Sequence, residues 1–244
     1  MIGIPTLNEG GNIQELLQSL DNELSRETKI LVVDDSSTDG SAEYLFEQAS
    51  LGRINLLSRP PNLGIGSAHK AIISFAAENR FDVLASMDAD GTHSVYDLNR
   101  LLSELNTSTN DLIIGSRFAD GGELKDWPKG RRLTSKLANF VTKTAIGRDL
   151  DCTSGLRAYR LQTALINSLL SVPYNDYRFF YRSIFTLAEN KVEISEIPVT
   201  LNPRKLGNSK MSTQKKITLA SSIILDAFKH YSISKSISQE KVGL

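Results

Sequence analysis

The stretch KILVVDDSSTDG, residues 29–40, contains the unit from which the first half of the chain is built. Residues 30–33 are all apolar, so a strand at 29–35 would be buried on both faces. Such strands are typical of a parallel sheet that helices cover on both sides. Polar residues follow at once, which predicts a loop at the carboxyl end of the strand.

The same alternation of apolar strands and helical patterns continues on both sides of this stretch. Strands are predicted at 2–6, 29–35, 53–59, 82–88 and 111–117, and helices at 12–24, 39–49, 66–79 and 94–105. This order predicts an α/β fold, with a mostly parallel central sheet flanked by helices and joined by right-handed crossovers. The second half is less regular, with helices predicted at 131–146, 161–170, 176–190 and 213–231, strands at 154–160 and 191–201, and a basic loop at 202–213.

The composition of the 244-residue chain is that of an ordinary globular protein, with 40% hydrophobic and 23% charged residues. Lys plus Arg equals Asp plus Glu at 28 each, which disfavours a nucleic-acid binder, whose surface would be net basic. The single cysteine, Cys152, excludes a disulfide within the chain. The N-terminus is unlike a signal peptide, and no apolar run reaches the ~18 residues of a membrane span. We therefore expect a cytoplasmic protein, soluble or peripheral at the membrane face.

Polar clusters follow four of the predicted strands. They are TLNE at 6–9, DDSSTDG at 34–40, DADGTH at 88–93 and SRF at 116–118. The carboxyl ends of parallel strands meet at one edge of a sheet, and ligands bind just outside that edge. The four clusters therefore predict one ligand site.

Asp88 and Asp90 put two carboxylates close together at the end of a buried strand. Mg²⁺ and Mn²⁺ prefer oxygen ligands, and they commonly bind through one or two carboxylates plus substrate phosphates. The alternative is a simple turn in which Asp90 precedes Gly91. The three other polar clusters at the same edge favour the metal.

Asp35 ends another strand at this edge, and we expect its carboxylate to contact a nucleobase or a ribose hydroxyl. Asp39 is expected to cap the helix that follows. The chain contains neither G-x-G-x-x-G nor a P-loop motif, which disfavours those two kinds of nucleotide site. NLGIGSAHK, residues 62–70, is interpreted as a loop that leads into a helix and can contact a phosphate or ribose.

The motifs IPTLNE, VVDDSSTDG, NLGIGSA, MDADGTH, GSRF, WPKGRR, SGLRAYR and GNSK occur in this order. Together they resemble glycosyltransferase family 2, and within it the dolichol-phosphate mannose synthases and related polyprenyl-phosphate glycosyl synthases. The resemblance covers roughly residues 1–230, so it is far more specific than any single motif. It implies a GT-A (Rossmann-like) fold, a nucleotide-diphosphate sugar donor, Mg²⁺ or Mn²⁺, and inversion at the anomeric carbon.

The resemblance also implies roles for residues within these motifs. Asp88 and Asp90 would hold the metal, and the catalytic set would be Asp90, Arg117 and Arg131. Arg117 would contact the sugar or a phosphate, and Arg131 would contact the acceptor phosphate. Arg204 and Lys210 would belong to a basic loop that closes over donor and acceptor. The residues expected to bind the nucleotide sugar are Pro5, Asn8, Glu9, Asp35, Gly64, Asp88, Arg204 and Lys210.

Two departures from the family pattern bear on the acceptor. Relatives usually carry a glutamate where this chain has Arg182, and relatives that glycosylate a hydroxyl use an aspartate base, for which Asp176 is the candidate. A hydroxyl benefits from a base as it attacks, whereas a lipid phosphate is already ionised and needs positioning and charge neutralisation. The arginine-rich acceptor side favours a phosphate.

The reaction expected from these features is transfer of a hexose, of the mannose or glucose type, from a donor such as GDP-mannose or UDP-glucose to a polyprenyl (dolichyl-type) phosphate. The alternatives are transfer to a glycan or protein hydroxyl, with Asp176 as base, and a catalytically silent nucleotide-sugar-binding protein.

We expect a single domain at 1–231, with a nucleotide-sugar-binding half at 1–120, an acceptor half at 121–231 and a frayed tail at 232–244. The amphipathic helix at 213–231 would either lie in a membrane surface or pack on the domain. A membrane-anchored partner would be a second way to reach a lipid acceptor.

Overall fold

The fold is that of a computed structural model of the chain. The structure describes residues 1–25, 27–127, 129–204, 206, 212, 214–215 and 218–226. Lys210, the end of the helix predicted at 213–231 and the tail predicted at 232–244 lie outside the described residues.

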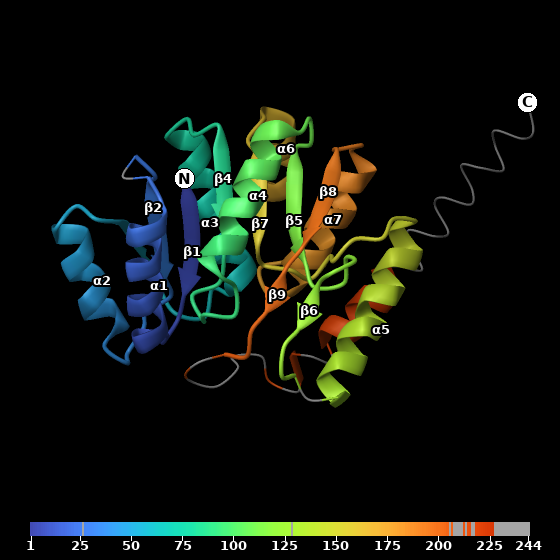
Figure 1. Ribbon diagram of the computed structural model, residues 1–244, viewed down its shortest axis with the longest axis horizontal. Helices are drawn as coiled ribbons and strands as arrows, with labels where there is room; N and C mark the ends of the chain where they lie inside the picture. Colours follow the sequence, from blue (N-terminus) through green and yellow to red (C-terminus); the bar gives the residue numbers. More distant parts are fainter. Residues whose placement is uncertain are drawn as a thin grey trace, which may run out of the picture.

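A seven-stranded sheet forms the centre of the molecule (Figure 1), in the order β3-β2-β1-β4-β7-β5-β8. Its strands are β1 (Ile2–Thr6), β2 (Ile30–Asp34), β3 (Asn55–Ser58), β4 (Val83–Ser86), β5 (Leu112–Ser116), β7 (Arg157–Arg160) and β8 (Ile194–Pro198). The predicted α/β class and mostly parallel sheet are confirmed, because every pair except those of β7 is parallel. β7 is inserted antiparallel between β4 and β5.

The segment predicted as one strand at 191–201 is divided. Residues 194–198 form β8, whereas Thr200–Leu201 forms β9, which leaves the main sheet and pairs with β6 (Glu123–Leu124). The backbone N–H of Val199, between the two strands, still donates to Ser116 O of β5 at 2.9 Å. The apolar pattern runs on through the change of partner, and β6 has only two residues, so a periodicity argument detects neither feature.

Helices cover both faces of the sheet, as the sequence predicted (Figure 1). One core cluster joins the sheet to α1 (Gly10–Glu23), α2 (Ser41–Ser50) and α4 (Val95–Thr107). The other joins it to α3 (Ile65–Glu78), α6 (Thr163–Leu170) and α7 (Arg178–Glu189). In β2, Val32 belongs to the first cluster, and Leu31 and Val33 belong to the second. This is why the strand is apolar at successive positions.

Two further helical segments lie beside the β5–β8 end of the sheet. α5 (Lys129–Ile146) follows β6, and residues 218–226 form a helix near the end of the described chain. Ile223 on that last helix is 1% exposed, and Asp226 Oδ2 accepts a hydrogen bond from the Tyr181 hydroxyl on α7 at 2.9 Å. The described part of this helix therefore packs on the domain. Within the described ranges, no helix combines the length and the apolar character that crossing a membrane requires.

Candidate active site

The loops after β1, β2, β4 and β5 meet at one edge of the sheet, at the bottom of Figure 1, as the polar clusters predicted. They border a cleft of about 1130 Å³. Of the residues predicted from the sequence, those that line this cleft are Pro5, Glu9, Asp35, Gly64, Asp88, Asp90, Arg117, Asp176 and Arg204. Arg131 lies on α5 with a side chain outside the described part of the structure, and Lys210 is outside it altogether.

Asp88 and Asp90 sit just beyond the end of β4, where the chain leaves the sheet. Asp88 accepts no hydrogen bond from any described residue. Burial and the neighbouring Asp90 raise the pKa of Asp88 to about 7. Asp90 is held firmly, because its Oδ1 accepts from the Thr92 backbone at 3.1 Å and from the Thr92 hydroxyl at 2.6 Å. A partly buried carboxylate without a donor, beside a fixed carboxylate, is a site that favours a cation.

Arg204 supplies the positive charge that balances this site. Its Nη2 donates to Asp90 Oδ2 at 2.9 Å and its Nη1 donates to Glu9 Oε1 at 2.7 Å. Glu9 Oε2 in turn accepts from Asn12 Nδ2 at 2.8 Å. The Arg204 guanidinium lies between the two carboxylates and neutralises the negative charges of Glu9 and Asp90. The described residues contain no group of three or more His, Cys, Asp or Glu side chains suited to a metal. A metal at Asp88 and Asp90 would therefore take its remaining ligands from a substrate or water.

Asp35 lies at the end of β2 and forms an ion pair with Arg59. Asp35 Oδ1 accepts from Arg59 Nε at 2.8 Å and from Nη2 at 2.5 Å, while Arg59 Nη1 donates to the Ser67 hydroxyl at 3.0 Å. Burial raises the pKa of Asp35, and the guanidinium opposes this shift. Both bonds use Oδ1, so Oδ2 is the carboxylate oxygen left to accept from a donor group of a ligand.

Asn8 and Asp39 hold loops together beside the cleft. Asn8 Oδ1 accepts from the Thr38 backbone at 2.7 Å, and Asn8 N–H donates to the Ser37 hydroxyl at 2.8 Å. Asp39 accepts from the backbones of Ser41 at 3.1 Å and Gly10 at 3.0 Å, so it serves the starts of both α2 and α1. Asn8, predicted to line the nucleotide pocket, is not among the residues that line the cleft.

Gly64 lets the loop before α3 touch the loop before α7. A Cβ at Gly64 would lie 2.4 Å from Asn175 O, and its φ of +88° is one that glycine tolerates best. Asp176 in the facing loop accepts from Arg178 Nε and, at 2.8 Å, from Arg178 Nη2. Burial acts to raise the pKa of Asp176, but the hydrogen bonds from Arg178 outweigh it and lower the pKa. This makes Asp176 a poor general base.

Arg182, which replaces the usual glutamate of the family, is not among the residues that line the cleft. It lies on α7, and its Nη2 is 3.5 Å from Glu189 Oε2. The residue that departs from the family pattern therefore lies outside the lining of the cleft.

Sequence reasoning missed Asp151, Thr153 and Tyr177, which all line the cleft. Asp151 forms a two-point ion pair with Arg117, with Nε at 2.9 Å and Nη2 at 3.1 Å from its oxygens. Burial raises the pKa of Tyr177 to about 12, with a further contribution from Asp88, so the hydroxyl stays protonated. DCT, residues 151–153, directly before the predicted strand at 154–160, was the available signal, because an acidic residue beside an apolar strand needs a reason.

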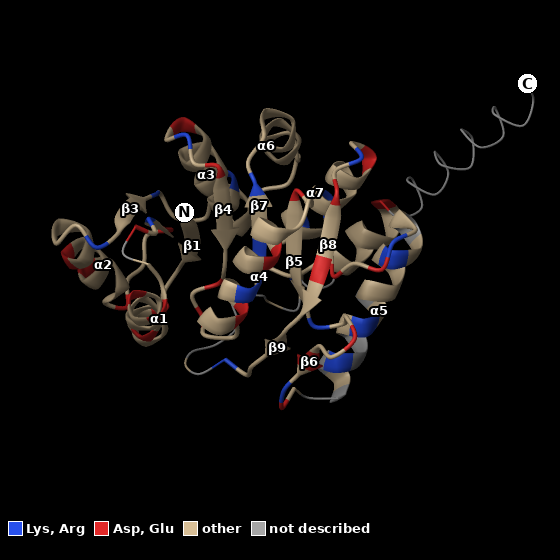
Figure 2. Ribbon diagram, turned by 45° about the horizontal axis from the view of Figure 1, so that its top comes forward, with Lys and Arg blue, Asp and Glu red and all other residues tan. Residues whose placement is uncertain are grey.

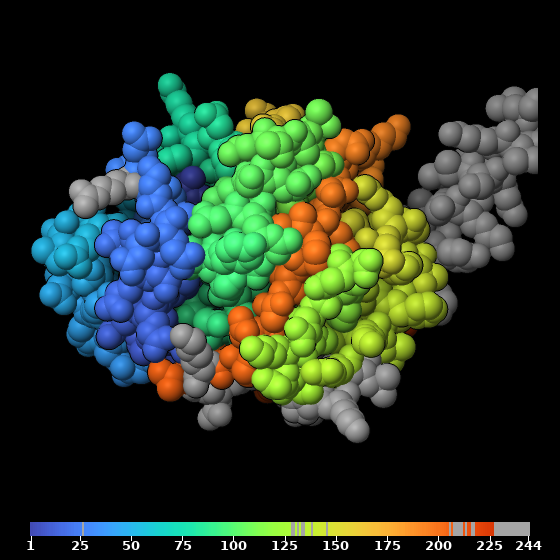
Figure 3. All heavy atoms as spheres, in the orientation of Figure 1, coloured from blue at the N-terminus to red at the C-terminus, as the bar shows by residue number. Residues whose placement is uncertain are grey.

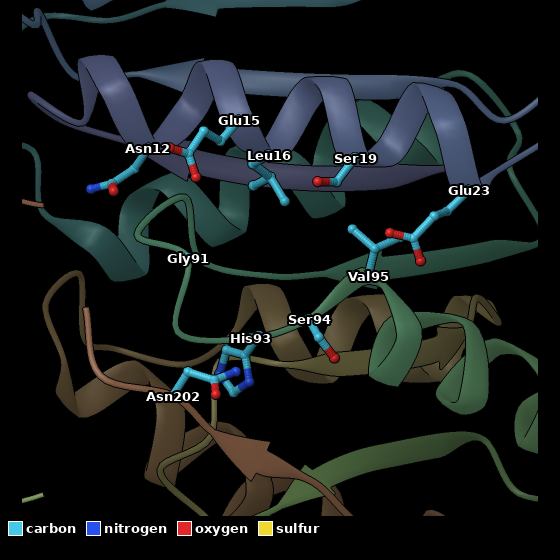
Figure 4. A pocket seen from close by; sticks show the side chains of 10 residues that line it. All are labelled: Asn12, Glu15, Leu16, Ser19, Glu23, Gly91, His93, Ser94, Val95 and Asn202. Carbon is cyan, nitrogen blue, oxygen red and sulfur yellow. The ribbon is translucent and has the colours of Figure 1, made fainter. Parts of the chain in front are cut away.

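A second cavity of about 220 Å³ lies between α1 and the loop that follows Asp90 (Figure 4). His93 lines both this cavity and the main cleft. Burial lowers the pKa of His93 to about 4, so the ring is neutral at pH 7. His93 Nδ1 and Asn12 Oδ1 are buried without a hydrogen-bond partner among the described residues.

Comparisons with known proteins give the class of this site. The family description Glycosyl transferase family 2 matches residues 1–185. The chain is 36% identical over 211 residues to the undecaprenyl-phosphate mannosyltransferase of Micrococcus luteus, covering 86% of each chain. It is 34% identical to the polyprenol monophosphomannose synthase of Mycolicibacterium smegmatis, over 87% of this chain and 80% of that one. It is 32% identical to the dolichol-phosphate mannosyltransferase of Pyrococcus furiosus, over 85% of this chain and 58% of that one.

A solved structure with the same fold is glucosyl-3-phosphoglycerate synthase of Mycobacterium tuberculosis in complex with UDP. The TM-score is 0.68 at 15% identity, with 93% of this chain and 79% of that one covered. A structure of that enzyme with Mn²⁺, UDP and phosphoglyceric acid gives a TM-score of 0.67 at 16% identity, covering 94% and 77%. The GT-A fold predicted from the sequence is confirmed, and with the site it defines a glycosyltransferase. The chain belongs to glycosyl transferase family 2.

Proposed function

We propose that this glycosyltransferase moves a hexose, of the mannose or glucose type, from a nucleotide-diphosphate sugar to a polyprenyl phosphate, with a divalent metal and inversion at the anomeric carbon. The observation that carries the proposal is the make-up of the cleft. The carboxylates of Glu9, Asp35, Asp88 and Asp90 line it, and so do Trp127 and, on the last helix, Leu219, Ala220 and Ile223, which form its apolar wall. A polar site that opens onto an apolar wall suits a substrate with a charged head and a lipid tail.

At the donor end, Asp35 Oδ2 would accept from the nucleobase, and Asp88 and Asp90 would hold Mg²⁺ or Mn²⁺ against the diphosphate. When bound, the metal would neutralise charge on the departing nucleoside diphosphate. Arg204 would leave Asp90 and turn to the phosphates, because the metal then balances the carboxylate. The relatives solved with UDP and Mn²⁺ support this kind of donor end.

At the acceptor end, Arg117 would contact a phosphate, and the apolar wall would pack against the first isoprenoid units. A phosphate oxygen is already ionised, so the attack needs charge neutralisation and alignment instead of a base. The lowered pKa of Asp176 agrees with this and disfavours transfer to a hydroxyl. The names of the bacterial relatives, a mannosyltransferase of undecaprenyl phosphate and a monophosphomannose synthase of polyprenol, support the same acceptor class.

The test is a panel of donors and acceptors. GDP-mannose, UDP-glucose and related sugars are offered with Mn²⁺ and either a polyprenyl phosphate, the corresponding polyprenol or a soluble glycan. We expect transfer to the phosphate with at least one donor and none to the polyprenol. Equal transfer to the polyprenol would favour the hydroxyl alternative, and donor binding without transfer to any acceptor would favour the silent binding protein.

We also propose that the α5 end of the molecule faces a lipid surface. Leu137 and Phe140 are 61% and 64% exposed on one side of α5, and Leu225 on the last helix is 61% exposed. Lys and Arg residues recur along the sequence of α5 (Figure 2), and they would meet anionic headgroups. The last helix also supplies Leu219, Ala220 and Ile223 of the apolar wall, so a lipid acceptor held at this surface would lie near the cleft.

Replacing both Leu137 and Phe140 by serine is expected to reduce binding to vesicles that contain anionic lipid by about 10-fold, because two apolar side chains would no longer insert. Vesicle co-sedimentation measures this. Phe46→Ser is the matched control, since Phe46 is 71% exposed on α2, at the opposite end of the molecule (Figure 3). Equal loss of binding in the control, or no loss in the double variant, would contradict the assigned surface.

Replacing Arg204 by glutamine is expected to strengthen Mn²⁺ binding about 10-fold in the absence of donor. The guanidinium neutralises Asp90 and Glu9, so its removal leaves both carboxylates without a counter-charge. Calorimetric titration with Mn²⁺ measures the change. Arg178→Gln removes a cation that lines the same cleft but pairs with Asp176, and it should leave Mn²⁺ affinity unchanged. Unchanged affinity in Arg204→Gln would show that the metal does not share this carboxylate site.

A further inference from the structure

We propose that Asp151 is a positioning residue, which aims the free edge of Arg117 at a substrate phosphate. The proposal rests on the proposed function. Arg117 Nε donates to Asp151 Oδ2 at 2.9 Å, and Nη2 donates to Asp151 Oδ1 at 3.1 Å and to the Thr153 hydroxyl. These bonds use three of the five guanidinium N–H groups. The two on Nη1 have no acceptor among the described residues.

The position of Asp151 is fixed by its own contacts. Its side chain is 1% exposed. Its carboxylate also accepts from the Thr153 backbone at 3.2 Å, and its own N–H donates to Glu196 Oε2 on β8 at 2.9 Å. A carboxylate with this many donors and so little exposure has one arrangement open to it, so it can impose that arrangement on the guanidinium.

Arg157 fixes the rest of the same loop. Its guanidinium is buried and donates to Ser154 O at 2.8 Å and to Cys152 O at 3.0 Å. It also donates to Phe180 O at 2.8 Å, which ties the loop to α7. Residues 151–155 are therefore held between β8 on one side and α7 on the other, and they form a rigid support for Arg117.

The support places Arg117 next to the proposed metal pair. Gly155 ends the same loop, and a Cβ added there would come within 2.9 Å of Asp88 Oδ2. Asp88, Gly155, Asp151 and Arg117 all line the cleft. The free Nη1 edge can therefore reach a phosphate at the metal or one on the acceptor side. Both ligands present the same chemistry, phosphate oxygens that accept hydrogen bonds from the two N–H groups of Nη1.

The expected benefit is orientation. An arginine on a cleft wall has several rotamers of similar energy, and binding a phosphate must first select one of them. In the folded protein, the Asp151 carboxylate already holds the Arg117 side chain in one rotamer. A loss of alignment of about 1 Å at a reacting group costs on the order of 10²-fold in rate. Asp151→Asn, which keeps the shape and removes the charge, should therefore lower kcat/KM by about 100-fold.

The test is a double-mutant cycle with Asp151→Asn, Arg117→Ala and the double variant. We expect Asp151→Asn to cost about 100-fold in kcat/KM when Arg117 is present and under about 3-fold in the Arg117→Ala background. If kcat/KM for the acceptor falls, Nη1 contacts the acceptor phosphate. If kcat/KM for the donor falls, Nη1 contacts the donor diphosphate. Equal losses in both backgrounds would mean that Asp151 acts only on the fold, which overturns the proposal.

A second variant keeps the proposal falsifiable if Asp151→Asn does not fold. Thr153→Val preserves the shape of the side chain but removes one acceptor of Nη2, and it should cost about 10-fold with Arg117 present and nothing in the Arg117→Ala background. If the wild type is active and the effects of the two substitutions in the cycle simply add, only the positioning role is refuted. A wild type without transfer to any acceptor would refute the proposed function as well.

Discussion

Replacing Asp88 by asparagine is expected to lower turnover on the order of 10³-fold with little change in thermal stability. Asp88 accepts no hydrogen bond from the described residues, so asparagine breaks no bond of the folded state. The loss would fall on the cation, because one of two anionic ligands becomes neutral and stabilisation of the leaving diphosphate weakens by several kcal/mol. Steady-state turnover with Mn²⁺, together with a thermal melt, measures both effects.

The matched control is Asp82→Asn. Asp82 is exposed and lies just before the other end of the same strand, β4, so it tests the change of charge away from the cleft. We expect activity within about 2-fold of the wild type. Turnover of Asp88→Asn within 3-fold of the wild type, with the same response to Mn²⁺, would remove the carboxylate pair from the mechanism.

Replacing Gly155 by alanine is expected to cost on the order of 10²-fold in turnover while the protein stays folded. The new Cβ would lie 2.9 Å from Asp88 Oδ2 and 3.0 Å from Oδ1, closer than such atoms can approach. The φ of Gly155 lies outside the left-handed region, so alanine adopts this backbone without strain. The free end of Asp88 can move aside, which spares the fold but displaces the carboxylate from its place.

Mn²⁺ affinity distinguishes displacement of Asp88 from a general disturbance of the fold. If Asp88 is displaced, Gly155→Ala should weaken Mn²⁺ binding together with turnover. Gly130→Ala is the control, since a Cβ at that helical glycine would meet nothing within 4 Å. Wild-type turnover in Gly155→Ala would show that the position of Asp88 is not critical. Loss of turnover with Mn²⁺ affinity unchanged would place the effect elsewhere in the 151–155 loop.

The sheet and the edge that carries the site could be predicted because both depend on local patterns. Buried parallel strands are apolar at successive positions, and the polar residues that end them must gather at one edge. Asp88 and Asp90 show this clearly, because the strand predicted at 82–88 ends at Ser86 in the structure. The last residues leave the sheet, and for that reason their carboxylates can face a ligand.

The partners of the site residues could not be predicted, because they are far away in sequence. Arg117 meets Asp151 only since β7 enters the sheet antiparallel between β4 and β5, and no local pattern indicates that insertion. Arg204 reaches Glu9 across most of the chain. For Asn8, the motif predicted a contact with a ligand. In the structure its side chain accepts a hydrogen bond from the Thr38 backbone and so holds the loop before α2.

The family resemblance was therefore more informative about which residues matter than about what each of them touches. Asp176 and Arg182 illustrate the difference. Both were considered as determinants of the acceptor, yet Asp176 is engaged by Arg178, and Arg182 lies near Glu189 away from the cleft. The proposed acceptor rests on the apolar wall and the free edge of Arg117, which only the folded chain brings together.

The most direct test of the account is NMR of the product formed from an α-linked nucleotide sugar, Mn²⁺ and a short-chain polyprenyl phosphate. The account predicts a hexose joined through its anomeric carbon to the lipid phosphate in the inverted, β configuration. An α-linked product, or a product in which the sugar is joined to a hydroxyl while the lipid phosphate is unchanged, would contradict it.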